Sequence, residues 1–151
     1  MSDRPVLKHL PAGDGKAVAL GKVALSFKAG ATVGSPYTVF EMTMPVGAAQ
    51  PLHTHPPDET MYVLEGELEL VGENGDRRRA GPGSVMHVPS GAAHGFVNVG
   101  DTPARMLMVS HVGQEAYFDD LAAAMSGRGD VAEVKSRHGV EMVGPVAARA
   151  K

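Results

Sequence analysis

The fold is decided by the stretch Gly47-Ala48-Ala49-Gln50-Pro51-Leu52-His53-Thr54-His55-Pro56-Pro57-Asp58-Glu59. Successive side chains of a strand alternate between its two faces, so His53 and His55 point the same way. Glu59 comes four residues later, after a Pro-Pro pair that can bend the chain back toward the same centre. Imidazole and carboxylate groups together suit divalent metals such as Fe, Mn, Ni, Zn or Cu. This segment therefore predicts part of a site for one divalent transition metal.

A second segment, from Gly83 to Asn98, follows after a short separation. Together the two segments closely resemble the two motifs of the cupin family, in the same order and with the same spacing. The residues that fill the first motif are Gly47, His53, His55, Glu59 and Gly66, and those that fill the second are Gly83, Pro89, Gly91, His94 and Asn98.

The resemblance implies a fold and a complete ligand set. The fold is a double-stranded β-helix, the jelly-roll or cupin barrel. The implied metal ligands are His53, His55, Glu59 and His94, and local spacing alone could not have linked His94 to the HxH pair. We expect Asn98 to be a turn residue that bonds to the backbone, and not a ligand.

The rest of the chain fits an all-β protein. Short segments rich in apolar and β-branched residues are bounded by Gly, Pro or Asp, a pattern typical of a sandwich or barrel. The Asn74-Gly75 pair predicts a hairpin turn. The expected strand segments are 17–28, interrupted at Gly21, then 37–44, 60–71, broken at Gly66, 85–88, 93–99 and 105–112.

The C-terminal part has helical spacing instead. Residues 114–126 predict a helix with Gly127 after its end. Asp130 and Glu133 have the form of a capping box, so a second short helix can run to about His138. We expect a single domain over 1–151, with a barrel core at about 36–112 and a helical tail at about 113–151. The helices should pack outside the barrel, with its mouth or a partner subunit as alternatives.

Composition excludes several classes of protein. The chain has 151 residues and no cysteine, which rules out disulfides, thiolate metal sites and cysteine nucleophiles. The net charge of −3 predicts no nucleic-acid partner, and the cluster at residues 77–79 reads as a solvated hairpin face. No apolar run is long enough to span a membrane, and the first residues lack a secretory signal. We expect a cytoplasmic protein.

Strand alternation also predicts a pocket. Met61 and Val63 share the face of Glu59, and Phe96 shares that of His94, so these three should line a mostly apolar pocket below the metal. Packing in the core is an equally good reading of all three. His87 precedes the second motif and can be a pocket acid or base, or can support a ligand, although a surface histidine is the commoner outcome.

The favoured function is that of a metal-dependent dioxygenase acting on a small enolic or aromatic substrate, because the chain is similar to the quercetin-dioxygenase-like cupins. Glu59 would then be a catalytic base as well as a ligand. One alternative is a metal-dependent isomerase or lyase on a sugar or oxo-acid, for which Arg105 is a candidate pocket cation. Another is a non-catalytic module that binds a small ligand.

The partners we expect are a small-molecule substrate and a second copy of the chain. A jelly roll leaves sheet edges that another subunit can cover. The apolar stretch 6–25 can supply the strands for such a homodimer, and two-fold dimers are the commonest soluble oligomers.

Overall fold

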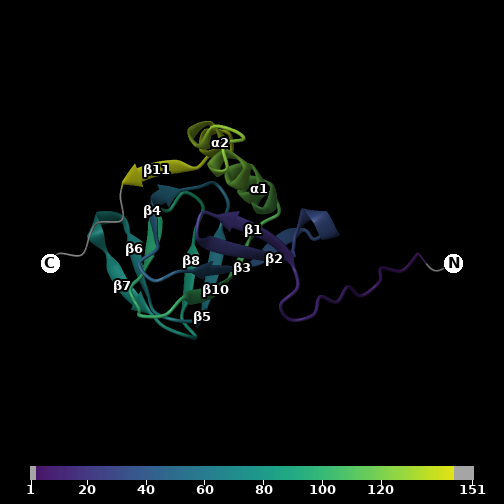
Figure 1. Cartoon of the computed structure of the whole chain (residues 1–151), viewed down its shortest axis with the longest axis horizontal. Coiled ribbons are helices and arrows are strands. Elements are labelled where there is room, and N and C mark those ends of the chain that lie inside the picture. The colour runs from purple at the N-terminus through teal and green to yellow at the C-terminus, as the bar shows by residue number, and fades with distance from the viewer. Residues whose placement is uncertain (1–2, 145–151) are drawn as a thin grey trace.

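Two antiparallel sheets form the walls of a barrel in the computed structural model of the chain, which describes residues 3–144 (Figure 1). One sheet has the strand order β1-β2-β3-β10-β5-β8 and the other β11-β4-β9-β6-β7. The strands are β1 (Lys16–Leu20), β2 (Val23–Ala29), β3 (Tyr37–Met44), β4 (Ala49–Thr54), β5 (Glu59–Glu65), β6 (Leu68–Gly72), β7 (Arg77–Ala80), β8 (Val85–Val88), β9 (His94–Asn98), β10 (Ala104–His111) and β11 (Glu141–Gly144). The helices are α1 (Gln114–Met125) and α2 (Val131–Arg137), with short 3-10 turns at Ala31–Val33 and Glu73–Gly75.

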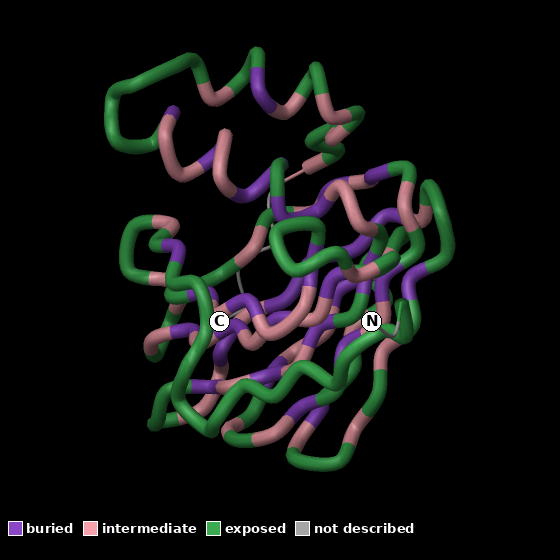
Figure 2. Tube along the Cα trace, turned by 90° about the vertical axis from the view of Figure 1, so that its right-hand side faces the viewer, coloured by how far each residue is buried: buried purple, intermediate pink, exposed green. Residues whose placement is uncertain are grey.

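The core lies between the two sheets, where the longer strands bury alternate residues, as β3 and β10 do. In β3 the even-numbered residues are buried and the odd-numbered ones are partly or fully exposed. Figure 2 shows buried residues recurring along the strands, whereas loops and the N-terminal segment are exposed. The prediction of an all-β jelly roll with C-terminal helices is confirmed. The fully buried large side chains include Phe40, Met44, Met61, Val63, Leu68, Phe96, Met106 and Met108.

Two turns show why the motif residues are needed. Gly66, between β5 and β6, has φ +87, and a Cβ there would lie 2.7 Å from the backbone of Ala104. Asn98, at the end of β9, is 2% exposed. Its amide donates to the backbone oxygens of Met44, Pro45 and Thr102, and its side-chain oxygen accepts from the Gly100 amide. The prediction that Asn98 bonds to the backbone is confirmed.

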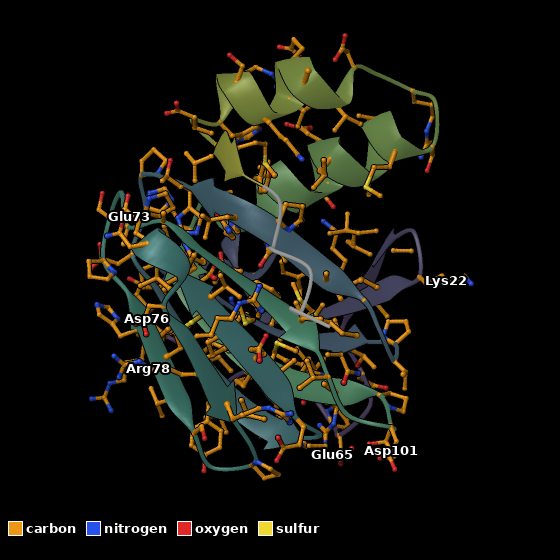
Figure 3. All side chains as sticks on the ribbon, turned by 90° about the vertical axis from the view of Figure 1, so that its left-hand side faces the viewer. Lys22, Glu65, Glu73, Asp76, Arg78 and Asp101 are labelled. Carbon is orange, nitrogen blue, oxygen red and sulfur yellow. The ribbon has the colours of Figure 1, made fainter. Side chains whose placement is uncertain are left out.

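The hairpin between β6 and β7 forms at the predicted turn. Asn74 and Gly75 both have positive φ, 60° and 75°, as a tight hairpin requires. The basic cluster beyond the turn is paired with acidic side chains, and Figure 3 shows Asp76 and Arg78 at the edge of the sheet. The pairs are Arg77 with Glu69, Arg78 with Asp76 and Arg79 with Glu67.

The two helices lie across one end of the barrel (Figure 1). Glu115, in the first turn of α1, is 3% exposed and accepts hydrogen bonds from the backbone and hydroxyl of Thr32 and from Lys16. Asp130 caps α2 by accepting from the Glu133 amide at 3.1 Å. The helices thus cover the mouth and do not pack only on the outer surface. The chain then returns as β11, which pairs with β4 and was not expected from the sequence.

The N-terminal segment before β1 runs along the outside of the barrel and away from it (Figures 1 and 2). Val6 and Leu7 are 83% and 91% exposed. Of the apolar stretch 6–25, only the part from Lys16 onward forms strands, and these pair with each other within the chain. Within residues 3–144, neither helix is long enough to cross a bilayer, since α1 has 12 residues.

Candidate metal centre

The predicted ligands come from both walls of the barrel. His53 near the end of β4 is directly opposite His94 at the start of β9, because the two strands pair in that register. The chain then crosses from one sheet to the other through His55 and the two prolines. It enters the second sheet at Glu59, the first residue of β5. All four side chains are buried, with exposed fractions of 4% to 6%.

Each histidine ring is held by a backbone carbonyl. The Nδ1 atoms of His53 and His55 lie 2.8 Å from the oxygens of Pro51 and Pro57, and that of His94 lies 2.9 Å from the oxygen of Ala92. A carbonyl can only accept, so each Nδ1 carries the proton and donates it. The Nε2 atom of each ring is left with a free lone pair, which is the form that binds a metal.

These lone pairs converge on one point. The three available nitrogens all lie within 4.8 Å of one another, and those of His55 and His94 are 3.1 Å apart. Two lone pairs at this distance repel each other, and a cation between them would remove that repulsion. Ligands about 2.1 Å from an ion and at right angles to each other are about 3 Å apart, which matches this separation. The three buried histidines can therefore hold a metal ion.

The carboxylate of Glu59 lies beside this cluster. Its two oxygens are each 3.9 Å from one ring nitrogen, Oε2 from His55 and Oε1 from His94. Its Oε2 also accepts a hydrogen bond of 3.5 Å from the side-chain amide of Gln114 on α1. A carboxylate at this position can reach an ion held by the histidines or act on a molecule bound next to it.

Burial sets the charge of these groups. It lowers the pKa of His94 to about 4, helped by the nearby His53. It is also the main cause that lowers the pKa of His53 and His55. Burial raises the pKa of the Glu59 carboxyl from its ordinary 4.5 to about 7. At neutral pH the rings are thus uncharged, as ligation requires.

A cavity of about 200 Å³ opens from the histidines toward the helices. Most of its wall is apolar, with Met42, Met44, Phe96 and Met108 from the barrel and Phe118 from α1. Besides the ligands, its polar lining residues are Gln50, Gln114, Tyr117 and Lys135. The side-chain oxygen of Gln50 is buried without a hydrogen-bond partner among the described residues, so it is available to a bound molecule.

The structure brings only part of the expected pocket together. Phe96 lines the cavity, whereas Met61 and Val63 are 0% and 1% exposed and lie in the core beyond its lining. His87 is not brought to the cavity. Strand β8 pairs with β5 so that His87 is opposite Thr60, on the outer face, where its Nδ1 is 2.9 Å from the Thr60 hydroxyl.

Arg105 also lies outside the cavity. It forms ion pairs with Glu41 at 3.2 Å and Glu65 at 2.8 Å on the exposed face of its sheet. The cation that lines the cavity is instead Lys135, on α2. Arg105 is therefore not the pocket cation that an isomerase or lyase function was expected to need.

Three polar cavity residues on the helices were not predicted as pocket residues from the sequence: Gln114, Tyr117 and Lys135. Burial of Gln114 could have been predicted from the sequence, because it shares one helical face with the apolar Tyr117, Phe118 and Leu121. A polar side chain in an apolar stripe has to find a buried partner, and here that partner is Glu59. Burial raises the pKa of Tyr117 to about 12, so it remains a neutral phenol at neutral pH.

Comparison with known proteins agrees with the motifs and the fold. Residues 40–110, which include all four predicted ligands, match the family described as "Cupin domain". The chain belongs to the cupin superfamily. As a cupin it carries both motifs on the strands and turns that bring His53, His55, Glu59 and His94 together.

One curated relative of this cupin is the dimethylsulfoniopropionate lyase of Ruegeria pomeroyi. The two are 43% identical over 51 residues, which make up 34% of this chain and 25% of the lyase. The match thus spans only a quarter of that relative's length.

Two solved structures share more of the cupin's length. The polyketide cyclase of Streptomyces resistomycificus is 25% identical with a TM-score of 0.65, over 71% of this chain and 80% of the cyclase. A putative ethanolamine utilization protein from Salmonella typhimurium is 31% identical with a TM-score of 0.51, over 60% of this chain and 69% of that protein.

The histidine cluster predicts how metal binding responds to substitution. We expect about one divalent ion per chain in the purified protein, and a loss of affinity by orders of magnitude in His53→Ala and His55→Ala, because each removes a direct ligand. Acid should also release the ion, since protonated histidines cannot bind it. Metal analysis and competition with a chelator measure both effects. His87→Ala is the matched control, and full metal content in the His53→Ala/His55→Ala double variant would contradict the site.

A second prediction concerns the protein stripped of metal. The pKa of Glu59 in the folded chain, about 7, is above its ordinary 4.5, so this group favours folding below pH 4.5 and opposes it as pH rises through 7. We expect Glu59→Gln to stabilise the metal-free protein by up to about 3 kcal/mol near pH 8, and much less near pH 5. Urea unfolding with a chelator present measures this.

The lowered histidine pKa values act in the opposite direction and destabilise both proteins in acid, so they cancel in the comparison. Glu65→Gln is the control, because Glu65 lies at the other end of the same strand with its side chain 63% exposed (Figure 3). Equal stabilities of Glu59→Gln and the parent protein near pH 8 would show that the buried carboxyl carries no such cost.

Proposed function

We propose that this cupin is a metal-dependent enzyme in which Glu59 removes a proton from a small bound substrate. One observation carries the proposal: the buried carboxyl of Glu59 lies 3.9 Å from two converging histidine nitrogens and lines the cavity beside them. A general base has to lie within reach of the proton that it removes. The carboxyl also faces a cavity, so it can reach a ligand as well as a metal.

The proposed ion is one divalent Fe, Mn, Ni, Zn or Cu, held by His53, His55, His94 and, in the resting protein, Glu59. When bound, such an ion supplies Lewis-acid chemistry, which polarises a substrate oxygen and makes nearby protons more acidic. The histidines hold their positions through the backbone carbonyls. Gln114 donates to Glu59 and orients its carboxylate, so that the other oxygen can take the proton.

The cavity limits the substrate. At about 200 Å³ it is smaller than a site for a drug-sized molecule, so the substrate has few heavy atoms. Met42, Met108 and Phe118 surround its apolar part and keep water out. The neutral phenol of Tyr117 and the side-chain oxygen of Gln50 offer a donor and an acceptor to its polar atoms.

Two reactions begin with such a proton transfer. The comparisons favour one that needs no O₂, a lyase, isomerase or cyclase reaction, because one relative is a lyase that acts on a propionate derivative and another is a polyketide cyclase. The second candidate is the dioxygenase expected from the sequence, acting on an enolic or aromatic substrate. It is supported by a donor set of three histidines and one glutamate, which leaves one or two ligand positions open.

The decisive variant for both reactions is Glu59→Gln. It keeps the size of the side chain and one oxygen but removes the base, so we expect much of the metal to remain and turnover to fall by about 100-fold or more. Candidate substrates are small carbonyl, enol and β-substituted carboxylate compounds, each followed by product analysis with and without O₂. O₂ consumption matched to product identifies the dioxygenase, and equal rates without O₂ identify the non-oxidative reaction.

The same variant distinguishes an enzyme from a binding protein. A non-catalytic module would show no turnover in the parent protein, and its ligand affinity would change only as far as metal occupancy does. Glu65→Gln serves again as the control, since its carboxylate lies outside the cavity. Near-normal turnover in fully metallated Glu59→Gln would remove Glu59 as the base.

We also propose that the protein is a homodimer in the cytoplasm. The exposed apolar residues Val6, Leu7 and Leu10 precede β1, which is an edge strand of the six-stranded sheet. Such a segment can pair with a second copy and cover its edge. Light scattering should give twice the chain mass of 15.7 kDa, and Val6→Ser/Leu7→Ser should shift the protein toward monomer. A monomer at micromolar concentration in the parent protein would contradict the dimer.

A further inference from the structure

Lys135 is located where the metal cavity meets the outside. It lines the cavity together with Val140 and Met142, and the same three residues also line a separate groove on the outer side of α2 and β11. Lys135 is partly buried and its neighbour Val134 is 3% exposed, which fixes this part of α2 on the core. Within residues 3–144, it is the single side chain with a permanent positive charge in the cavity lining.

The ammonium group of Lys135 lacks an acidic partner among the described residues. It contacts the sulfur of Met142 at 3.6 Å, which is only a weak acceptor. The nearby acids are used elsewhere: Arg137 pairs with Glu133 and Asp120, and His138 pairs with Asp120 as well. Glu141 precedes Met142 in β11, so its side chain is on the other face of the strand, and it is exposed.

Lys135 differs from an ordinary surface lysine in that it lines the cavity. Its ammonium contacts Met142, which is 42% exposed, so the charge lies at the solvent-facing edge of that cavity. The same cavity is lined by His53, His55 and Glu59, and Met142 pairs with His53 across β11 and β4, so a single molecule in the cavity can meet a cation at its edge and the base beside the histidines.

We propose that the substrate is a small organic anion whose carboxylate binds to Lys135 while its reacting end lies beside Glu59 and the histidines. The proposal rests on the proposed function, because it assigns the charge of that site's substrate. Lys135 is a specificity residue here and takes no part in the proton transfer. The apolar residues of the cavity lining favour a short hydrocarbon chain, and a neutral molecule of the same shape leaves Lys135 without its partner.

A binding experiment tests this without any turnover. The probes are straight-chain carboxylates from acetate to hexanoate, each compared with its neutral amide, which has nearly the same shape. Methionine methyl groups report binding by NMR, since Met42, Met44, Met108 and Met142 all line the cavity. Titrations are done on zinc-loaded and on metal-free protein, so that a carboxylate held by the ion alone is recognised.

We expect the best carboxylate to bind at least about tenfold more tightly than its amide, in both the zinc-loaded and the metal-free protein. This preference should disappear in Lys135→Met, which keeps the length and packing of the side chain, and should persist in Lys135→Arg. Lys22→Met is the matched control, because Lys22 is exposed and points away from the barrel (Figure 3).

Three results would overturn the proposal: equal binding of carboxylates and amides, no binding of any carboxylate, or an undiminished preference in Lys135→Met. Each is independent of the Glu59 experiment. If the carboxylate preference depends on Lys135 but no variant of Glu59 alters turnover, the anion site stands and the proposed base fails. If Glu59 is essential but the preference is absent, the enzyme stands and its substrate is not selected by charge.

Discussion

The pairing of β4 with β9 is the constraint on which the metal centre depends. It places His53 opposite His94 across one sheet, while the crossing through Pro56 and Pro57 delivers Glu59 to the other. A shift of one residue in this register would turn every side chain of β4 to the opposite face and remove His53 from the site. Gly66 lies in the turn after β5, and Asn98 lies at the end of β9. They therefore fix where one strand of each sheet ends.

The site also brings together several polar side chains whose burial is unfavourable. Three imidazole rings and one carboxyl are buried together there, and burial shifts the pKa value of each toward its neutral form. Buried polar groups without partners cost stability. A bound cation would reverse that balance, since it favours the neutral rings and the ionised carboxylate at once. Stability and metal content of this protein should therefore be measured together.

The sequence was informative wherever one local rule was enough. Short apolar segments bounded by Gly, Pro or Asp located β3 and β8, the Asn74-Gly75 pair located the hairpin turn, and the family motifs supplied the proposed ligands. It was uninformative where the answer depended on how distant elements meet. The facing of His87 follows from its register with Thr60, and Arg105 is drawn outward by Glu41 and Glu65. The three partners, Thr60, Glu41 and Glu65, are all far from His87 and Arg105 in the sequence.

Sequence-based prediction was limited in the same way for α1, α2 and β11, which together form a lid over the cavity. Gln114 and Lys135 belong to a tail whose position over the barrel is set by the contacts of Glu115 with Thr32 and Lys16. Those contacts join segments that are far apart in the chain, so helical periodicity could predict α1 and α2 but not what they cover. β11 is four residues long and carries no alternation strong enough to be recognised.

The order of these parts along the chain has a consequence for synthesis. The last of the proposed ligands is His94, β10 ends at His111, and α1, α2 and β11 follow from Gln114 onward. A chain made from its N-terminus therefore contains β1 to β10 and the ligand set before α1, α2 and β11 are added, and folding can follow the same order. An ion can then reach the histidines through an open mouth while the protein is being made. In the finished protein it would have to pass α1 and β11.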